Sequence, residues 1–380
     1  MNHNFINFHI LISHSPSCLN RDDMNMQKNA IFGGKRRVRV SSQSLKRAMR
    51  TSDYYSTHLG TPSERTRELG KLQSKYIDAL KERFSEDQVK QALELISGKQ
   101  GLSELPTKGV AVAPWVVEEV AHFCQIIADA GEDFDPKKLE KLIAKDVEAF
   151  NRATGQAVDI ALSGRMATSG LMTNIDGAMA VAHAITTHEV DSDIDWFTAV
   201  DDLVQEDKAK RKVGESEEGK GEQGSGHLDT QEFSSGVFYR YASLNIGQLQ
   251  ENLGGCSRDK ALEIASHVLH MLATVVPSAK QQSHAAYNPA DLALVSFSDI
   301  PISLANAYEA PVRATNNSGF LKPSLELLNT YWDKVHKGYG LNESCAEFIM
   351  DESTTLSDGI EKMASLPDLE KWVCQGGGDA

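Results

Sequence analysis

The stretch "GGKRRVRVSSQSLKRAMR", residues 33–50, decides which kind of fold the sequence predicts. Within it, "RVRV" at 37–40 alternates arginine with valine. This two-residue period predicts a strand with one apolar face and one face that carries Arg37 and Arg39. Serines follow at once, and the next residues have the spacing of a helix. A strand that leads directly into a helix indicates a chain that mixes both kinds of structure.

The predicted helix runs through "SLKRAMRTSDYY", with Ser41 or Ser42 as its N-cap. Leu45 and Met49 lie one turn apart and form its apolar face, which leaves another face for the cations. Backbone N–H groups at the start of a helix have no partner within the helix and can donate hydrogen bonds to a phosphate. The cations of this helix are Lys46, Arg47 and Arg50.

The basic residues of the chain are concentrated near its amino end. Between Arg21 and Arg50 there are nine basic residues and two acidic residues, so this window carries +7. The whole chain carries −14, which leaves −21 for the remainder. Segregation of charge on this scale predicts a site for a polyanion, because a phosphate responds to charges within about 8–10 Å. The alternative is a solvated face whose arginines pair with acids from elsewhere in the fold.

The overall composition is that of a globular protein. At 380 residues, with 41% hydrophobic and 24% charged residues, the chain is expected to form two or three domains, or one domain with large insertions. No apolar run reaches the roughly 18 residues of a membrane span, and no signal peptide is predicted. Five scattered cysteines without a CxxC pair suit a reducing cytoplasm and argue against a zinc module. We therefore expect a cytoplasmic protein with no membrane partner, no metal and no cofactor.

The rest of the chain alternates compact and extended patterns. "NFINFHILIS" at 4–13 predicts a buried strand, residues 58–156 are mostly helical, and "AVDIALSGRMATSG" at 157–170 predicts a strand that breaks into a loop. Two extended arms, 178–203 and 227–246, are predicted to pair as an antiparallel hairpin. The remaining predictions are a flexible polar tip at about 205–226, a helix capped by Ser257, a strand at 292–298 and a helix at 323–335.

One acidic motif suggests an alternative function. In "EVDSDID", Asp191, Asp193 and Asp195 fall on one face of a strand and could hold Mg²⁺ for phosphoryl chemistry. The chain would then be a stand-alone metal-dependent nuclease. The simpler explanation is a solvated strand face, because Val190 and Ile194 occupy the opposite side. No P-loop, GxSxG, HExxH or GxGxxG motif is present.

Long and unusual strings of the sequence resemble a known family. The chain resembles the repeated backbone subunit (CasC type) of type I-E CRISPR Cascade complexes, and the resemblance covers nearly its whole length. The strings that carry it are "FINFHILISHSPSCLNRDDMNMQKNAIFGGKRRVRVSSQSLKRAMR", "VDIALSGRMATSG", "DGAMAVAHAITTHEVDSDIDWFTAVDDL", "TQEFSSGVFYRYASLNIGQLQENLGG" and "NPADLALVSFSDIP".

The resemblance implies an α+β fold shaped like a right hand. A modified RRM-like (ferredoxin-like) palm would comprise residues 1–57 and 236–380, helical fingers 58–185, and a β-hairpin thumb 186–235. The resemblance also implies a non-catalytic, RNA-binding protein of antiviral defence. Several copies line up along the guide RNA (crRNA), grip its phosphates regardless of sequence, kink it and present its bases to target DNA. The other implied partners are further copies of the same chain and the large, small, Cas5-like and crRNA-endonuclease subunits of the ribonucleoprotein.

The resemblance also assigns roles to individual residues. The positions that match guide-RNA contacts of the family are Arg21, Lys28, Ser41, Gln43, Lys46, Arg47, Arg50, Arg165 and Met166. The thumb positions that match the site of a flipped base are Phe197, Thr198 and Leu228. A finger helix that contacts target DNA would supply Lys137, Lys138, Lys141 and Lys145, although composition alone favours a solvated lysine stripe. The tip at about 205–226 is longer than the family pattern, which leaves the contacts of the thumb tip open.

Overall fold

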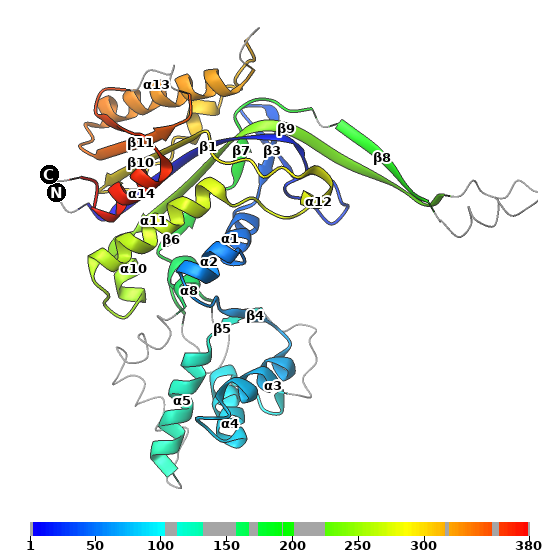
Figure 1. Cartoon of the computed structure of the whole chain (residues 1–380), viewed down its shortest axis with the longest axis vertical. Coiled ribbons are helices and arrows are strands. Elements are labelled where there is room, and N and C mark those ends of the chain that lie inside the picture. The colour runs from blue at the N-terminus through cyan, green and yellow to red at the C-terminus, as the bar shows by residue number, and fades with distance from the viewer. Residues whose placement is uncertain are drawn as a thin grey trace, which may run out of the picture.

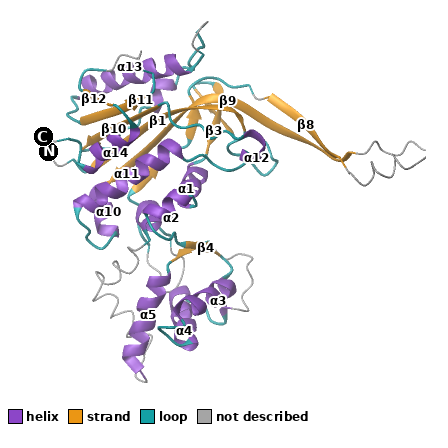
Figure 2. Ribbon diagram, in the orientation of Figure 1, coloured by secondary structure: helices purple, strands orange, loops and turns teal. Residues whose placement is uncertain are grey.

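The chain folds into a sheet with helices on both faces, a separate helical lobe and a two-stranded arm (Figure 1). The mixed α+β class that the sequence predicts is confirmed (Figure 2). The computed structural model describes residues 3–102, 112–131, 157–166, 174–191, 193–200, 225–315, 319–351 and 357–378. For residues 195–200 and 225–231 it describes the backbone alone.

The sheet is mostly antiparallel, and its strands follow the order β12-β11-β10-β1-β9-β7-β3-β2. β6 and β8 also pair with β9, and β11 and β12 form the parallel pair. The strands are β1 (Phe5–Ser17), β2 (Asn29–Phe32), β3 (Lys35–Val40), β6 (Met179–Val181), β7 (Ala184–Thr186), β8 (Asp193–Val200), β9 (Ser225–Asn245), β10 (Leu292–Ser298), β11 (Ser344–Ile349) and β12 (Ile360–Met363). The two ends of the chain therefore build one sheet, with β1 in its centre.

Two apolar layers hold helices against the sheet. On one face, β1 buries Ile6, Phe8 and Ile10 against α11 (Arg258–Thr274) and α14 (Leu366–Cys374). On the other face, Leu11 of β1 packs below α13 (Leu321–Tyr339) and the 3₁₀ turn η3 (Ala305–Tyr308). Each fully buried aliphatic or aromatic side chain contributes about 1.5–3 kcal/mol, so these two layers supply most of the stabilisation of the sheet.

Shorter helices complete this part of the chain. They are α1 (Ser42–Arg50), α2 (Asp53–His58), α8 (Val158–Ser163), α10 (Ile246–Asn252) and α12 (Gln281–His284). Ser257 caps α11 by accepting a hydrogen bond from the Lys260 N–H, as the sequence predicts. None of the helices in the described ranges is both long enough and apolar enough to cross a membrane.

The helical lobe has a core of its own. It consists of α3 (Leu69–Leu80), α4 (Glu86–Ser97) and α5 (Val117–Ala130), and a short ladder of β4 (Glu64–Thr66) and β5 (Ala113–Trp115) lies at its border with the sheet (Figure 1). Tyr76, Leu93 and Phe123 are fully buried between the three helices. The expectation of a mostly helical region after residue 58 is confirmed for the described part of that region.

The arm is an antiparallel ladder of β8 and the first half of β9, as the sequence predicts. Thr198 lies opposite Leu228, and Phe197 lies opposite Asp229. The second half of β9 pairs with β1, from Ser234 to Asn245. One continuous strand therefore belongs both to the arm and to the sheet.

Two local predictions from the sequence are wrong. The single helix expected through residues 44–55 is two helices, because Ser52 accepts a hydrogen bond from the Tyr55 N–H and caps a second one. The strand expected at the start of 157–170 is the helix α8. A short apolar run does not distinguish a buried strand from a buried helix turn, and here the contacts of Asp159 stabilise the helix.

Candidate nucleic-acid interface

The turn from β3 into α1 projects the predicted cations from one helix face. The Ser41 hydroxyl accepts a hydrogen bond from the Ser44 N–H at 3.3 Å and caps α1. Leu45 and Met49 are buried against the rest of the fold, so the cations of α1 lie on its other faces. Ser41 is itself buried, whereas Gln43 is exposed in the first turn.

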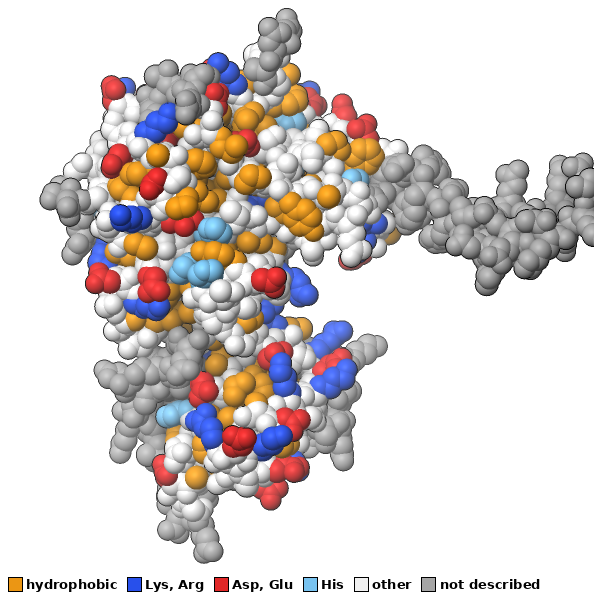
Figure 3. All heavy atoms as spheres, in the orientation of Figure 1, with side chains coloured by type: hydrophobic (Ala, Val, Ile, Leu, Met, Phe, Trp, Pro, Cys, Tyr) orange, Lys and Arg blue, Asp and Glu red, His pale blue; other side chains and the backbone are white. Residues whose placement is uncertain are grey.

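Four cations lie together where α1 meets the helical lobe. We call Lys46, Arg47, Arg50 and Arg65 the basic cluster. Arg50 Nε lies 4.0 Å from Asp159 Oδ2, and the Arg65 guanidinium lies 3.5 Å from the same oxygen. Within the described residues, no other carboxylate forms an ion pair with the cluster. Lysine and arginine side chains are visible along this border in Figure 3.

Each cation of the basic cluster makes the charged form of its neighbours less favourable. Burial lowers the pKa of Lys46, and the nearby charge of Arg65 lowers it further. Burial also lowers the pKa of Arg50, and the charges of Arg65 and Arg47 act in the same direction against the opposing effect of Asp159. Like charges that are held together cost free energy, which a bound anion relieves. The cluster therefore has the electrostatics of an anion site.

Asp159 organises this cluster from the first turn of α8. Its Oδ1 accepts a hydrogen bond from the Ser63 N–H at 3.0 Å, and its Oδ2 accepts one from the Ser63 hydroxyl at 2.6 Å. Arg50 in turn donates to the Ser63 carbonyl at 3.1 Å. The sequence analysis missed both Asp159 and Arg65. Their neighbours in sequence gave no signal, because the contact joins segments 96 residues apart.

Three other cations of the basic window have structural partners. Arg37 is fully buried and donates to the carbonyls of Thr186 and Tyr308 at 2.9 Å. Arg36 pairs with Glu232 at 2.6 Å, and Lys35 pairs with Glu189 at 3.1 Å. For Lys35 and Arg36, pairing with acids from elsewhere in the fold is the correct interpretation.

A second group of cations comprises Arg39 of β3, Lys28 and Arg21. Arg39 forms a hydrogen bond with His183 Nδ1 at 2.9 Å. Burial lowers the pKa of His183, and the charges of Arg39 and Lys28 lower it further, so Lys28 lies close to the same ring. Arg21 is exposed in the loop before β2 and donates to Asn25 Oδ1 at 2.6 Å.

Arg165 and Met166, next to one another in sequence, have opposite environments. Arg165 is buried and pairs with Glu119 of the helical lobe, whereas the Met166 side chain is 86% exposed. The turn before them requires glycine: Gly164 has a φ of +78°, and a Cβ there would lie 2.7 Å from the Ile175 carbonyl oxygen. Met166 is therefore presented to solvent on a tightly constrained turn.

For the remaining predicted site residues the structure describes either the backbone alone, the whole residue, or nothing. Phe197, Thr198 and Leu228 lie on the arm ladder, and their side chains are outside the description. Lys137, Lys138, Lys141 and Lys145 lie outside the described residues. Asp191 and Asp193 are exposed, and the described side chains do not bring them together with a third metal-binding group.

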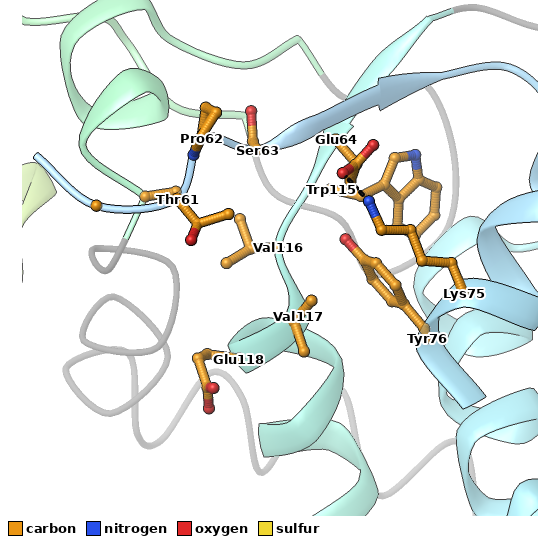
Figure 4. A pocket seen from close by; sticks show the side chains of 12 residues that line it. Thr61, Pro62, Ser63, Glu64, Lys75, Tyr76, Trp115, Val116, Val117 and Glu118 are labelled. Carbon is orange, nitrogen blue, oxygen red and sulfur yellow. Dashed lines mark hydrogen bonds and ion pairs between the residues drawn. The ribbon is translucent and has the colours of Figure 1, made fainter. Parts of the chain in front are cut away.

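A cavity of about 430 Å³ lies between residues 60–64 and the helices α3 and α5 of the helical lobe (Figure 4). Thr61 and Pro62 line it on one side, and Tyr76 and Trp115 line it on the other. Glu64 lies beside Trp115 and forms an ion pair with Lys75. The Tyr76 hydroxyl points into the cavity and has no hydrogen-bond partner among the described residues. The cavity lies at the border that Asp159 and Ser63 hold together.

A family model described as CT1975-like protein matches residues 6–372 of the chain. The chain belongs to this CT1975-like family. None of the curated proteins compared with this CT1975-like protein matches it.

Solved structures extend the comparison to the whole fold. One chain, from a structure described as "CRISPR RNA-guided surveillance complex, pre-nicking", is 28% identical with a TM-score of 0.75, over 98% of the CT1975-like protein and 100% of that chain. A chain from a structure described as "CRISPR RNA-guided surveillance complex" is 24% identical with a TM-score of 0.60, over 98% and 99% of the two chains. The CT1975-like protein therefore has the fold of chains found in CRISPR surveillance complexes.

Proposed function

We propose that this CT1975-like protein is a guide-RNA-binding subunit of a Cascade-type CRISPR surveillance complex, and that it is the repeated backbone subunit of a type I-E system. The single observation that carries the proposal is the basic cluster, in which four cations lie together and only two of them, Arg50 and Arg65, share the carboxylate of Asp159. The 28% identity with a chain of a surveillance complex, over the full length of both chains, supports the same function.

The cluster suits a nucleic acid that the protein contacts through the sugar-phosphate backbone and not through the bases. A subunit that holds guides of any sequence must grip phosphate and sugar and leave the base edges free for pairing. Lys46, Arg47 and Arg50 supply charges without a base-reading geometry, and exposed Met166 is placed to wedge against a base. Phe197, Thr198 and Leu228 of the arm would fill the gap that a flipped nucleotide leaves.

The proposal includes an assembly. Residues 1–57 and 236–380 act as an RRM-like palm, 58–185 as fingers and 186–235 as a thumb. Copies of the chain polymerise along the crRNA in the cytoplasm beside the other Cascade subunits, and the fingers contact target DNA through Lys137, Lys138, Lys141 and Lys145.

RNA binding by charge-removing variants tests the proposal. Lys46→Ala combined with Arg50→Ala should weaken binding to single-stranded RNAs of unrelated sequence to the same extent. Each lost phosphate contact should reduce the slope of log affinity against log salt by about 0.7, or about 1.4 for the pair. Lys71→Ala combined with Lys81→Ala, on the surface of α3, is the matched control and should change neither quantity. A loss confined to some sequences, or one no larger than that of the control, would contradict the proposal.

We further propose that the subunit is not catalytic. Purified protein incubated with RNA and with DNA, with and without Mg²⁺, should leave both intact. Metal-dependent cleavage that Asp193→Ala abolishes would show that the acidic motif is an active site instead.

A further inference from the structure

Three side chains of types that can bind a metal converge where α13 leads into β11. His336 lies in the last turn of α13, Glu343 in the connection, and Cys345 in β11. His336 Nε2 lies 2.8 Å from Glu343 Oε2, and Cys345 Sγ lies 4.0 Å from the same oxygen. One nitrogen, one oxygen and one sulfur atom thus surround a common point.

The histidine is oriented as a ligand would be. His336 Nδ1 lies 2.9 Å from the Trp332 carbonyl, and a carbonyl can only accept, so Nδ1 carries a proton. The other ring nitrogen, Nε2, therefore faces Glu343 with a lone pair or with a second proton. A hydrogen bond from the distant ring nitrogen to a backbone carbonyl is the usual support of a metal-bound histidine.

The carboxylate has an unused oxygen. The Glu343 side chain is 3% exposed, and its Oε1 is buried without a hydrogen-bond partner among the described residues. The Ser296 and Ser298 hydroxyls are hydrogen-bonded to the same carboxylate and help to hold it in place. A buried carboxylate oxygen without a partner costs about 1–3 kcal/mol or more, which a cation would offset.

The thiol of Cys345 adds a third possible metal ligand to the pair of His336 and Glu343. Its side chain is buried, and a sulfur–oxygen distance of 4.0 Å is too long for a strong hydrogen bond. A carboxylate, a thiolate and a neutral imidazole carry two negative charges, which one divalent cation neutralises. Nitrogen, oxygen and sulfur ligands together select zinc over magnesium or calcium, which bind oxygen.

We propose that His336, Glu343 and Cys345 form a binding site for Zn²⁺ that ties the end of α13 to β11. In a tetrahedral site the nitrogen and oxygen ligands lie about 3.3 Å apart and the sulfur about 3.6 Å from each. The ring and the carboxylate therefore separate by about half an ångström, and the thiol moves in by a similar distance. Cys345 releases its proton to solvent as the zinc–sulfur bond forms, and the fourth position takes water.

This inference is independent of the proposed function. It departs from the expectation that the chain binds no metal, for which the absence of a CxxC pair was one reason. The ligands instead follow the spacing His-x6-Glu-x-Cys in "HKGYGLNESC".

Metal titration of the full chain, purified without a histidine tag and stripped with a chelator, tests the site. Zn²⁺ in competition with a chromophoric chelator should bind at one equivalent. Cys345→Ser should weaken that binding at least about tenfold, whereas Cys374→Ser, at an exposed position, should not. With Co²⁺ in place of zinc, the wild type should show a thiolate-to-cobalt charge-transfer band that Cys345→Ser lacks. Equal zinc affinity in the wild type and Cys345→Ser would overturn the site.

A second variant separates zinc binding from an ion pair that is only structural. Glu343→Gln keeps the shape of the side chain and removes its charge. Zinc should raise the melting temperature of the wild type and raise that of Glu343→Gln much less, since a ligand that binds the folded state stabilises it by an amount that grows with the logarithm of the ratio of its concentration to its Kd. A melting temperature of the wild type that does not respond to zinc would show that His336 and Glu343 are an ion pair and nothing more.

Discussion

Arg165 and Glu119 face one another across two parallel hydrogen bonds of 2.7 and 2.9 Å, and water reaches neither side chain. The pair joins the turn after α8 to the first turns of α5, so it connects the part of the chain around the sheet to the helical lobe. The resemblance assigns Arg165 to guide RNA, and in this structure its guanidinium is already engaged with a carboxylate. RNA contact at this position stays a prediction.

Removal of one partner of this pair should destabilise the helical lobe. Arg165→Met leaves the Glu119 carboxylate buried without its cation, a change that typically costs about 3–5 kcal/mol. Urea unfolding followed by the fluorescence of Trp115, which lies in the same lobe, measures the loss. The control is Arg83→Ala, which breaks an exposed pair with Glu118 and should cost no more than about 1 kcal/mol. Equal effects of the two variants would contradict the structural role.

The carboxylate of Asp159 should compete with a bound anion for the basic cluster. Asp159→Asn preserves the size of the side chain and removes the charge that Arg50 and Arg65 share. We expect a lower melting temperature without RNA, because the cations then repel one another without compensation. Saturating single-stranded RNA should raise the melting temperature of Asp159→Asn more than that of the wild type.

Asp78→Asn, in an exposed pair with Lys81, is the control for the loss of an acidic charge. It should leave the shift that RNA causes unchanged. If RNA raised the melting temperatures of Asp159→Asn and of the wild type by the same amount, phosphates would not bind where Asp159 acts.

A buried histidine should make the fold sensitive to acid. Burial, together with the charge of Arg240, lowers the pKa of His14 from 6.5 to about 3. Arg240 donates to His14 Nε2 at 3.2 Å, so the neutral ring is the form that fits the structure. Between pH 6.5 and pH 3 the unfolded chain binds a proton that the folded chain excludes. Stability should therefore fall with decreasing pH in this window and be independent of this group above it.

His14→Gln should reduce this acid sensitivity. The amide oxygen of glutamine can still accept from Arg240, while the titration of this side chain is gone. Between pH 6.5 and pH 3 the slope of unfolding free energy against pH should decrease by up to about 1.4 kcal/mol per pH unit. Above pH 7.5 the plots of unfolding free energy against pH for the wild type and His14→Gln should be parallel. Identical slopes from pH 6.5 to pH 4 would show that His14 is not held neutral.

The arm ladder defines how much of the chain between its strands is dispensable. Val200 is the last paired residue of β8 and Ser225 the first of β9, so the insert ends before Ser225 rather than at residue 226. Replacement of residues 205–223 by a short glycine linker should preserve the melting temperature, RNA affinity and assembly. A deletion that extends to Leu228 removes paired strand and should impair assembly. Loss of assembly in the shorter deletion would show that the insert has a role of its own.

Elements with strong local signals were predictable from the sequence. The apolar run of β1, the alternation in β3 and the serine caps of α1 and α11 all depend on residues close together in the chain. The pairing of the arm followed from two extended segments on either side of a polar insert. The misses depend on distant partners. Arg37 looks like a solvent-facing cation until Thr186 and Tyr308 supply the carbonyls that bury it. The basic cluster was predictable only in part. The sequence indicated the cations of α1, whereas Asp159 and Arg65 join them only through contacts between distant segments of the fold.

The continuity of β9 has a mechanical consequence. No hinge separates the arm from the sheet, because the same backbone hydrogen-bonds to β8 at one end and to β1 at the other. The direction of the arm therefore follows from the twist of the sheet. If copies of the chain assemble in a row, as we propose, their arms would recur at equal intervals and the spacing would be set by the protein.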